Sequence, residues 1–192
     1  GGLTVYGANE VTLSNLKFIG KVTSDKNEKS TYGLDIAKST SVKLDNIRTE
    51  NHLYRGIQVR NGSVVNLASR NTHVNDKVHL QVIQKDGEKE SVVNNGSEYY
   101  IVGTPIVDKN KTATTEYYIK NEVSVSTPED FKHNIGVSGS VLDLQGNITF
   151  TPEDIPEGQE SLELIVGSNV VINGNGATLD LGGNASITFK GN

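Results

Sequence analysis

Hydrophobic residues recur at every second position in short segments along most of this chain. Leu3–Val5, Leu34–Ile36 and Val42–Leu44 each place one polar residue between two apolar ones. A period of two predicts β-strands that turn one face toward a core. No comparable helical periodicity runs through these segments, so the sequence predicts an all-β protein.

The strand pattern itself repeats at a nearly regular interval. Similar strands begin at Leu3, Leu34, Ile57 and Leu80, so that successive starts are 31, 23 and 23 residues apart. In each of the first three copies, a second apolar segment begins eight residues later. A unit of about 23 residues buries too little apolar surface by itself, so the units are expected to stack into a shared core.

Stacked parallel units place equivalent residues on top of one another. Asn15 and Asn46 hold the same place in their units, and Ser69 holds it in the third. Asn tolerates the left-handed backbone conformation of a sharp corner, and stacked amides can bond one another. We therefore expect a short Asn ladder at a corner between strands. The expected internal columns are Leu3, Leu34 and Ile57, and Leu13, Leu44 and Leu67.

The pattern changes near Tyr99. Two tyrosine-containing segments, 99–102 and 116–119, flank a polar stretch and predict a hairpin or two strands that leave the stack. Farther on, Thr127-Pro128-Glu129-Asp130 predicts a short helix that ends by Gly136, because it supplies an N-cap, a Pro at the first helical position and acids in the first turn. Strand triplets then resume. The predicted organisation is stacked coils over 1–98, connecting strands over 99–122, and a capping helix with further coils over 123–192.

Two stretches carry a family resemblance. Val170–Leu181 looks like the opening coils of right-handed parallel β-helices of the pectate-lyase-like class. Thr127–Phe189 resembles the start of the pectate-lyase-like modules in Gram-positive surface adhesins, which begin with a short helix capping the first coil. The resemblance implies a right-handed parallel β-helix, or solenoid, with one capping helix near 127–135. This fold carries lyases, hydrolases, phage spikes and adhesins, so it does not choose among functions.

The order of these parts leaves two arrangements open. The helix that would cap a solenoid falls in mid-chain, and Ile187–Asn192 would read on naturally into Gly1–Val5. One interpretation is a segment of a longer or tandem array, taken out of phase with its units. The other is two consecutive solenoid pieces joined by Tyr99–Val123.

Composition and charge exclude several classes. The formal net charge of −5 disfavours a nucleic-acid binder, which would carry a basic stripe. The absence of Cys excludes disulfides and thiolate metal sites. No segment approaches the ~20 apolar residues of a membrane-spanning helix, so membrane insertion is not expected.

The charged residues of the chain are either catalytic groups or solvated surface charges. Lyases of the class that the chain resembles use a base beside a carboxylate neutralised by Ca²⁺, and hydrolases use paired acids. The sequence has no paired Asp-Asp, no His-Gly turn and no Arg-x-Pro-x-x-Arg element. We therefore expect no catalytic residues. If the chain is an enzyme, Arg55 is the candidate base, with Asp35 and Asp45 one coil earlier.

Other candidate sites follow from residue type. Paired tyrosines can stack on sugar rings, which makes Tyr99, Tyr100, Tyr117 and Tyr118 the candidate ligand-binding residues; the alternative is that one Tyr of each pair packs inward. No cofactor is expected; Gly-rich turns around Asp180 only faintly suggest Ca²⁺. The four histidines are expected to be exposed or at coil edges, with no zinc role: His52, His73, His79 and His133.

The leading hypothesis is a non-catalytic structural or adhesive module of an extracellular bacterial protein, cell-surface or secreted. Its expected partners are a glycan or host surface ligand and neighbouring modules of a longer chain. A polysaccharide lyase or glycoside hydrolase of the β-helix class is the alternative, and a phage tail-spike-like protein is the second alternative.

Overall fold

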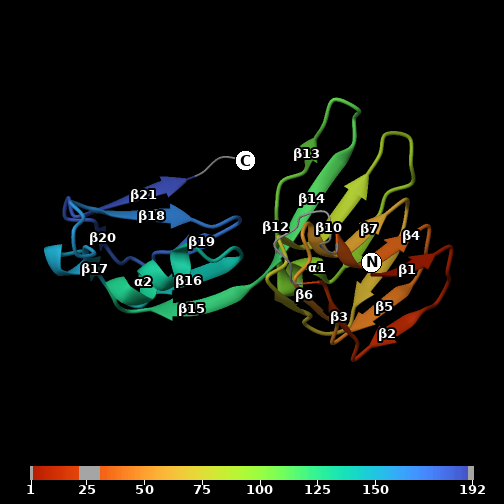
Figure 1. Cartoon of the computed structure of the whole chain (residues 1–192), viewed down its shortest axis with the longest axis horizontal. Coiled ribbons are helices and arrows are strands. Elements are labelled where there is room, and N and C mark those ends of the chain that lie inside the picture. The colour runs from red at the N-terminus through yellow and green to blue at the C-terminus, as the bar shows by residue number, and fades with distance from the viewer. Residues whose placement is uncertain (1, 22–30, 190–192) are drawn as a thin grey trace. The chain divides into compact units, whose positions relative to one another are not determined.

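The structure is a computed structural model that describes residues 2–21 and 31–189. It is mainly β, with mostly parallel sheets and, in the described residues, two short α-helices (Figure 1). The chain divides into two compact units, Gly1–Ile119 and Lys120–Asn192. The boundary falls inside the segment 99–122, whose larger part belongs to the first unit.

Three parallel sets of strands build the first unit. Each set takes one strand from each repeat, so a strand pairs with its equivalent one repeat later. The first set is β1 (Leu3–Tyr6), β4 (Tyr32–Ala37), β7 (Arg55–Arg60) and β10 (Val78–Gln84). The second is β2 (Thr12–Ser14), β5 (Val42–Asp45), β8 (Val64–Leu67) and β11 (Val92–Asn94). The third is β3 (Lys17–Ile19), β6 (Arg48–Glu50) and β9 (Thr72–Val74).

The pairing register confirms that both predicted columns stack, although Leu3, at the end of the first column, is 40% exposed rather than internal. Leu3 pairs with Leu34, and Leu34 with Ile57. In the second sheet, Leu44 pairs with Leu13 on one side and with Leu67 on the other. Leu34, Ile57, Leu44 and Leu67 are buried in one hydrophobic cluster, and Leu13 packs against it. A shift by one residue would turn these side chains to the opposite face, so burial determines the register.

The corner between the second and third strands has the predicted Asn ladder. Asn15 and Asn46 have φ angles of 53° and 51°, in the left-handed region. Asn46 Nδ2 donates to Asn15 Oδ1 over 2.8 Å. In the third copy Ser69 occupies the equivalent position. Its hydroxyl accepts a hydrogen bond from the backbone N–H of Asn46 at 2.7 Å.

Antiparallel strands close one end of the first sheet. After helix α1 (Gly96–Tyr99), β12 (Tyr100–Val102) and β13 (Ile106–Val107) both pair with β14 (Ala113–Ile119), and β14 pairs antiparallel with β10. This confirms that the chain leaves the parallel pattern after Tyr99. The hairpin covers the free edge of β10, while Figure 1 shows its tip extending beyond the sheet.

The second unit also pairs its strands in parallel, at spacings that range from 19 residues between Asn121 and Ser140 to 31 between Ile148 and Leu179. Val141 pairs with Val171, and Ile148 pairs with Leu179. Its sheets are β15 (Asn121–Val125), β16 (Ser140–Leu144) and β19 (Val171–Asn173); β17 (Ile148–Thr149) and β20 (Leu179–Asp180); and β18 (Leu162–Val166) and β21 (Ala185–Phe189).

Helix α2 (Pro128–Ile135) begins where the sequence predicts. The Thr127 hydroxyl accepts from the backbone N–H of Asp130, whose carboxylate in turn accepts from the backbone N–H of Thr127. This reciprocal pair satisfies N–H groups that a helix start otherwise leaves open. Phe131 and Ile135 bury the inner face of α2 in the second hydrophobic cluster. The same four residue types recur at Thr151–Asp154, but there they form only a 3₁₀ turn, Pro152–Asp154, before Pro156.

Candidate functional site

A polar row crosses the first sheet of unit 1. Asp35, Gln58, Gln81 and Glu116 stand in register on β4, β7, β10 and β14. Asp35 lies between the core residues Leu34 and Ile36, so strand alternation turns it to the other face of the sheet. The row therefore lies on the face of the sheet opposite the apolar core, although Asp35, Gln58 and Gln81 are themselves buried there.

The Asp35 carboxylate is nevertheless held by neighbouring side chains. Arg60 donates from Nε to Oδ1 at 2.9 Å and from NH2 to Oδ2 at 2.7 Å, and Gln58 Nε2 donates to Oδ1 at 2.6 Å. These bonds leave Asp35 only 1% exposed. The hydrogen bond from the Arg60 guanidinium to Asp35 raises the pKa of Arg60. The Asp35 carboxylate is thus paired with Arg60 and shielded from solvent.

Arg55 reaches the same row through Gln58. Its NH1 donates to Gln58 Oε1, and its guanidinium lies over the Tyr54 ring at 5.8 Å from the centroid. Burial lowers the pKa of Arg55, although Asp35 and Glu116 oppose the change. Its buried Nε has no hydrogen-bond partner within residues 2–21 and 31–189. The structure therefore brings Arg55 and Asp35 into one network, bridged by Gln58.

Asp45 lies elsewhere. It ends β5 in the second sheet, whereas Asp35 and Arg55 belong to the first. The Ser69 hydroxyl donates to Asp45 Oδ1 at 2.7 Å, which ties this carboxylate to the Asn corner. Asp45 therefore lies outside the network of Arg55, Gln58 and Asp35.

The four tyrosines are divided between the core and the surface of the hairpin. Tyr100 is 1% exposed and Tyr118 is 5% exposed, so neither ring face is open to a ligand. Tyr99 and Tyr117 are half-buried against the hydrophobic cluster. Tyr100 and Tyr117 meet edge to face, with ring centroids 6.2 Å apart. The aromatic pairs join the hairpin to the coils.

Three of the histidines are inside the molecule, so the expectation that they are exposed was wrong for them. His52 is 3% exposed, and the side chain of His73 is fully covered. His79 is half-buried, and its ring stacks on that of His73 with centroids 4.9 Å apart. Only His133, in the second unit, is exposed. Burial of His could not be read from strand patterning, because the covering residues come from the next coil and the hairpin.

Asp76 organises this buried cluster. It accepts from the His52 backbone N–H at 2.9 Å and from the Thr49 hydroxyl at 2.5 Å, and it lies 2.8 Å from His52 Nδ1. Burial alone would raise the pKa of Asp76, but hydrogen bonds from His52, His73 and Thr49 together lower it. The carboxylate is therefore ionised in the folded protein at neutral pH.

A consistent set of proton positions follows from these contacts. The Thr49 hydroxyl donates to Asp76, so His73 Nδ1, 2.7 Å from Thr49 Oγ1, must be the donor to that oxygen. His73 Nε2 then accepts from the Tyr100 hydroxyl at 2.9 Å. This requires a neutral His73, in agreement with the lowering of its pKa by burial. Tyr100 thus connects the hairpin to the interior of the coils.

His79 anchors the other hairpin strand. Its Nδ1 accepts from the backbone N–H of Ile119 at 2.9 Å, and its ring lies against Tyr118. Burial, with the neighbouring His73, lowers the pKa of His79 to about 3. His79 is therefore neutral near pH 7, as its acceptor role requires.

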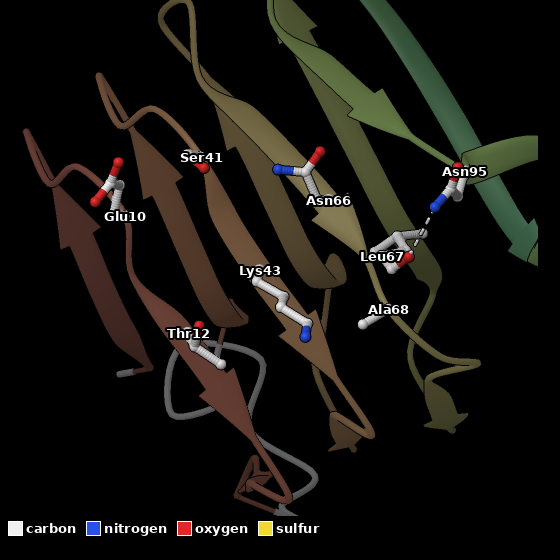
Figure 2. Close-up of a pocket in the computed structure, with 8 residues that line it drawn as sticks. All are labelled: Glu10, Thr12, Ser41, Lys43, Asn66, Leu67, Ala68 and Asn95. Carbon is white, nitrogen blue, oxygen red and sulfur yellow. Dashed lines mark hydrogen bonds between the residues drawn. The ribbon is translucent and has the colours of Figure 1, made fainter.

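The outer face of the second sheet carries a hollow of about 400 Å³ (Figure 2). Most of the residues that line it are polar, and they come from successive repeats. Lys43 and Asn66 rise from the neighbouring strands β5 and β8, and Asn95 Nδ2 donates to the Leu67 carbonyl at 3.1 Å. The full lining is Glu10, Thr12, Ser41, Lys43, Asn66, Leu67, Ala68 and Asn95. Sequence analysis did not single out this surface, because its residues are ordinary outward-facing strand and corner positions.

Residues 2–21 and 31–189 contain neither a metal-binding cluster nor a membrane-spanning helix. No group of three or more His, Asp or Glu residues there is arranged to hold a metal ion. The turn after Asp180 is closed by its own carboxylate, which accepts from the Gly182 N–H at 2.9 Å. In this same part of the chain, no helix has the length and apolar character needed to cross a membrane.

Comparison of the chain with family models, curated proteins and solved structures found no match.

Proposed function

We propose that this chain is a non-catalytic structural and adhesive module of an extracellular bacterial protein, built as a right-handed parallel β-helix of the pectate-lyase-like class. The observation that carries the proposal is the in-register parallel pairing of equivalent strands from successive repeats. In unit 1 this pairing occurs in all three strand sets. In this proposal the chain winds as a solenoid, whose coils bond to one another along the stacking axis.

Such a stack suits a spacer that holds a binding surface away from its anchor. Every coil of unit 1 is joined to the next by backbone hydrogen bonds and by a continuous apolar core. Ladders such as Asn15–Asn46 add side-chain bonds in the same direction. Bending the stack would break several of these contacts together, so the module resists bending.

The state of the candidate catalytic residues also supports a non-catalytic role. Asp35 is neutralised by Arg60 and covered by it, and Asp45 lies on another sheet. A polyuronate lyase needs a base beside a carboxylate of the substrate, and a hydrolase needs two acids facing one bond. Asp35 and Asp45 do not face each other across one groove.

One observation favours the alternative of a carbohydrate-active enzyme. Arg55 has a lowered pKa, which is the direction needed for an arginine to act as a base, and its contact Gln58 also binds Asp35. A polysaccharide lyase with Arg55 as its base is therefore the second candidate. It would require a substrate to displace the bonds that close this network.

Two measurements separate these functions. Beads coated with the purified chain are passed over immobilised bacterial and host polysaccharides under flow, and retention without product formation supports the adhesive module. Polygalacturonate incubated with the chain, with and without Ca²⁺, is followed by ultraviolet absorbance and by a reducing-sugar assay. We expect no turnover. Turnover that Arg55→Ala abolishes and Lys77→Ala preserves would establish the enzyme instead.

A further inference from the structure

The hollow on the second sheet of unit 1 has a repeating floor. Thr12, Lys43 and Asn66 stand in register on β2, β5 and β8. Neighbouring strands are about 4.8 Å apart, which is close to the length of one pyranose ring in an extended sugar chain. A linear oligosaccharide lying across the strands would therefore meet a new polar side chain at each sugar.

Open hydrogen-bonding positions line this floor. In the part of the chain that the structure describes, Glu10 and Lys43 make no ion pair, and no side-chain bond engages Ser41. Asn66 uses its Oδ1 to accept from Asn94 Nδ2 at 2.7 Å, which leaves its own Nδ2 as a donor. Asn95 uses Nδ2 on the Leu67 carbonyl and keeps its Oδ1 as an acceptor. The hollow thus offers both donors and acceptors, and a sugar hydroxyl can engage either.

The backbone at the rim is strained. Glu10 and Ser41 both have φ angles of 56°, and they occupy equivalent places in successive coils. Eight of the twelve non-glycine residues with positive φ in the described chain are Asn, the residue that adopts this conformation most readily. Glu or Ser at such a place costs more than Asn or Gly would, and strain of this kind concentrates at functional sites. The strain therefore points to a use for these two side chains.

The charge of the lining selects among ligands. One carboxylate, Glu10, and one ammonium, Lys43, balance each other, and the remaining polar groups are hydroxyls and amides. A strongly anionic chain would meet Glu10, and a cationic one would meet Lys43. Small side chains at Ser41 and Ala68 leave space between the longer ones.

We propose that this hollow binds a neutral, hydroxyl-rich oligosaccharide that lies across the strands of the second sheet. The inference deepens the proposed adhesive role, on which it rests, by naming the surface and the ligand class. Asn66 Nδ2 and Lys43 Nζ donate to sugar hydroxyls, while Glu10 and Asn95 Oδ1 accept from them.

The test is calorimetric titration of the intact chain with cellohexaose, maltohexaose and chitohexaose, with hexagalacturonate as the anionic comparison. Asn66→Leu and Ala68→Leu remove a donor or fill the hollow, and Thr72→Leu is the matched control on the outer face of the third sheet. Lys43→Ala is matched by Lys77→Ala. Thermal unfolding of every variant shows that the fold is kept.

We expect at least one neutral oligosaccharide to bind. Its affinity should fall about three- to tenfold in Asn66→Leu and in Lys43→Ala, as for the loss of one hydrogen bond, and should be unchanged in both controls. The inference would be overturned if no neutral hexasaccharide bound, or if the chain preferred hexagalacturonate. It would also be overturned if Asn66→Leu, Ala68→Leu and Lys43→Ala bound as tightly as the unmodified chain. If the beads are retained equally well when coated with the variants of the hollow, the adhesive module is supported but this site is not its binding surface. Oligosaccharide binding that the variants of the hollow weaken, without retention of the beads, would support this site and contradict the adhesive module.

Discussion

The side-chain amide of Asn46 donates to Asn15 Oδ1 over 2.8 Å, although 31 residues separate the two in the chain. Both residues turn the backbone at the same corner of successive coils, with φ angles near 50°. The two Asn residues therefore serve two purposes. Each forms the left-handed turn at its own corner, and the bond between them fixes the register between successive repeats. It gives the first prediction.

Replacing Asn46 by Gly keeps the left-handed turn but removes the amide bond, so we expect a loss of about 1 kcal/mol in the free energy of unfolding. Replacing it by Val also places a β-branched residue in the left-handed region, which costs about 1–2 kcal/mol more. Urea unfolding of both variants measures the difference. Equal stability of the two variants would show that the corner tolerates a β-branched residue and that the turn argument fails.

Leu44 lies in the middle of an internal column, with Leu13 and Leu67 on either side. It is fully buried, so Leu44→Ala should destabilise unit 1 by about 2–5 kcal/mol through lost burial and the cavity left behind. Leu16→Ala is the comparison, because Leu16 is 38% exposed and should cost much less. Chemical denaturation followed by circular dichroism distinguishes them; a Leu44→Ala cost no larger than that of Leu16→Ala contradicts the stacked core.

Arg60 is the main partner of the covered Asp35 carboxylate. Arg60→Gln should destabilise the fold by about 1–3 kcal/mol, because a buried charged group loses its strongest bonds. Adding Asp35→Asn should restore part of that loss, since a neutral amide needs no counter-charge. A double variant that is less stable than Arg60→Gln alone would refute this coupling. Thermal melting of the unmodified chain, both single variants and the double variant measures this coupling as a double-mutant cycle.

Stability should fall as the solution is acidified, beginning well above the range in which ordinary carboxylates titrate. The folded pKa of His79 is about 3, below its usual value of 6.5, so the unfolded chain binds the proton first. The stabilisation is complete above about pH 6.5 and is lost as the pH falls toward 3, by at most about 1.4 kcal/mol per pH unit for each such histidine. His73 acts in the same direction. The lowered pKa of Asp76 adds a further loss below about pH 4.

His79→Asn tests this assignment. Asn can still accept from the Ile119 N–H but does not titrate, so the variant should lose part of the decline in melting temperature between pH 7 and pH 4. His133→Gln serves as the control, because His133 is exposed in the second unit and its removal should leave the pH profile unchanged. Identical profiles for His79→Asn and the unmodified chain would exclude His79 as a source of acid sensitivity.

The sequence by itself determined the elements that depend on neighbouring residues. Alternation of apolar positions gave the strands, and the 23-residue interval gave the parallel pairing and the columns through Leu44. Thr127, Pro128 and Asp130 specified the start of α2, because a capping box is made within a single turn. Asn15 and Asn46 marked their corner, because few residues other than Gly and Asn enter the left-handed region at low cost.

Only the tertiary structure decided which polar residues meet. His52, His73 and Asp76 cluster because β6 and β9 pair in parallel and bring the segments that follow them together. Tyr100 joins them because the hairpin reverses onto β10. Asp35 and Asp45 are near in sequence but lie on different sheets, since a corner of the coil separates them. The hollow beside Lys43 and Asn66 likewise forms from residues of several repeats. Alternation indicates which face of a strand a side chain takes, whereas its neighbours on that face are set by the packing of distant segments.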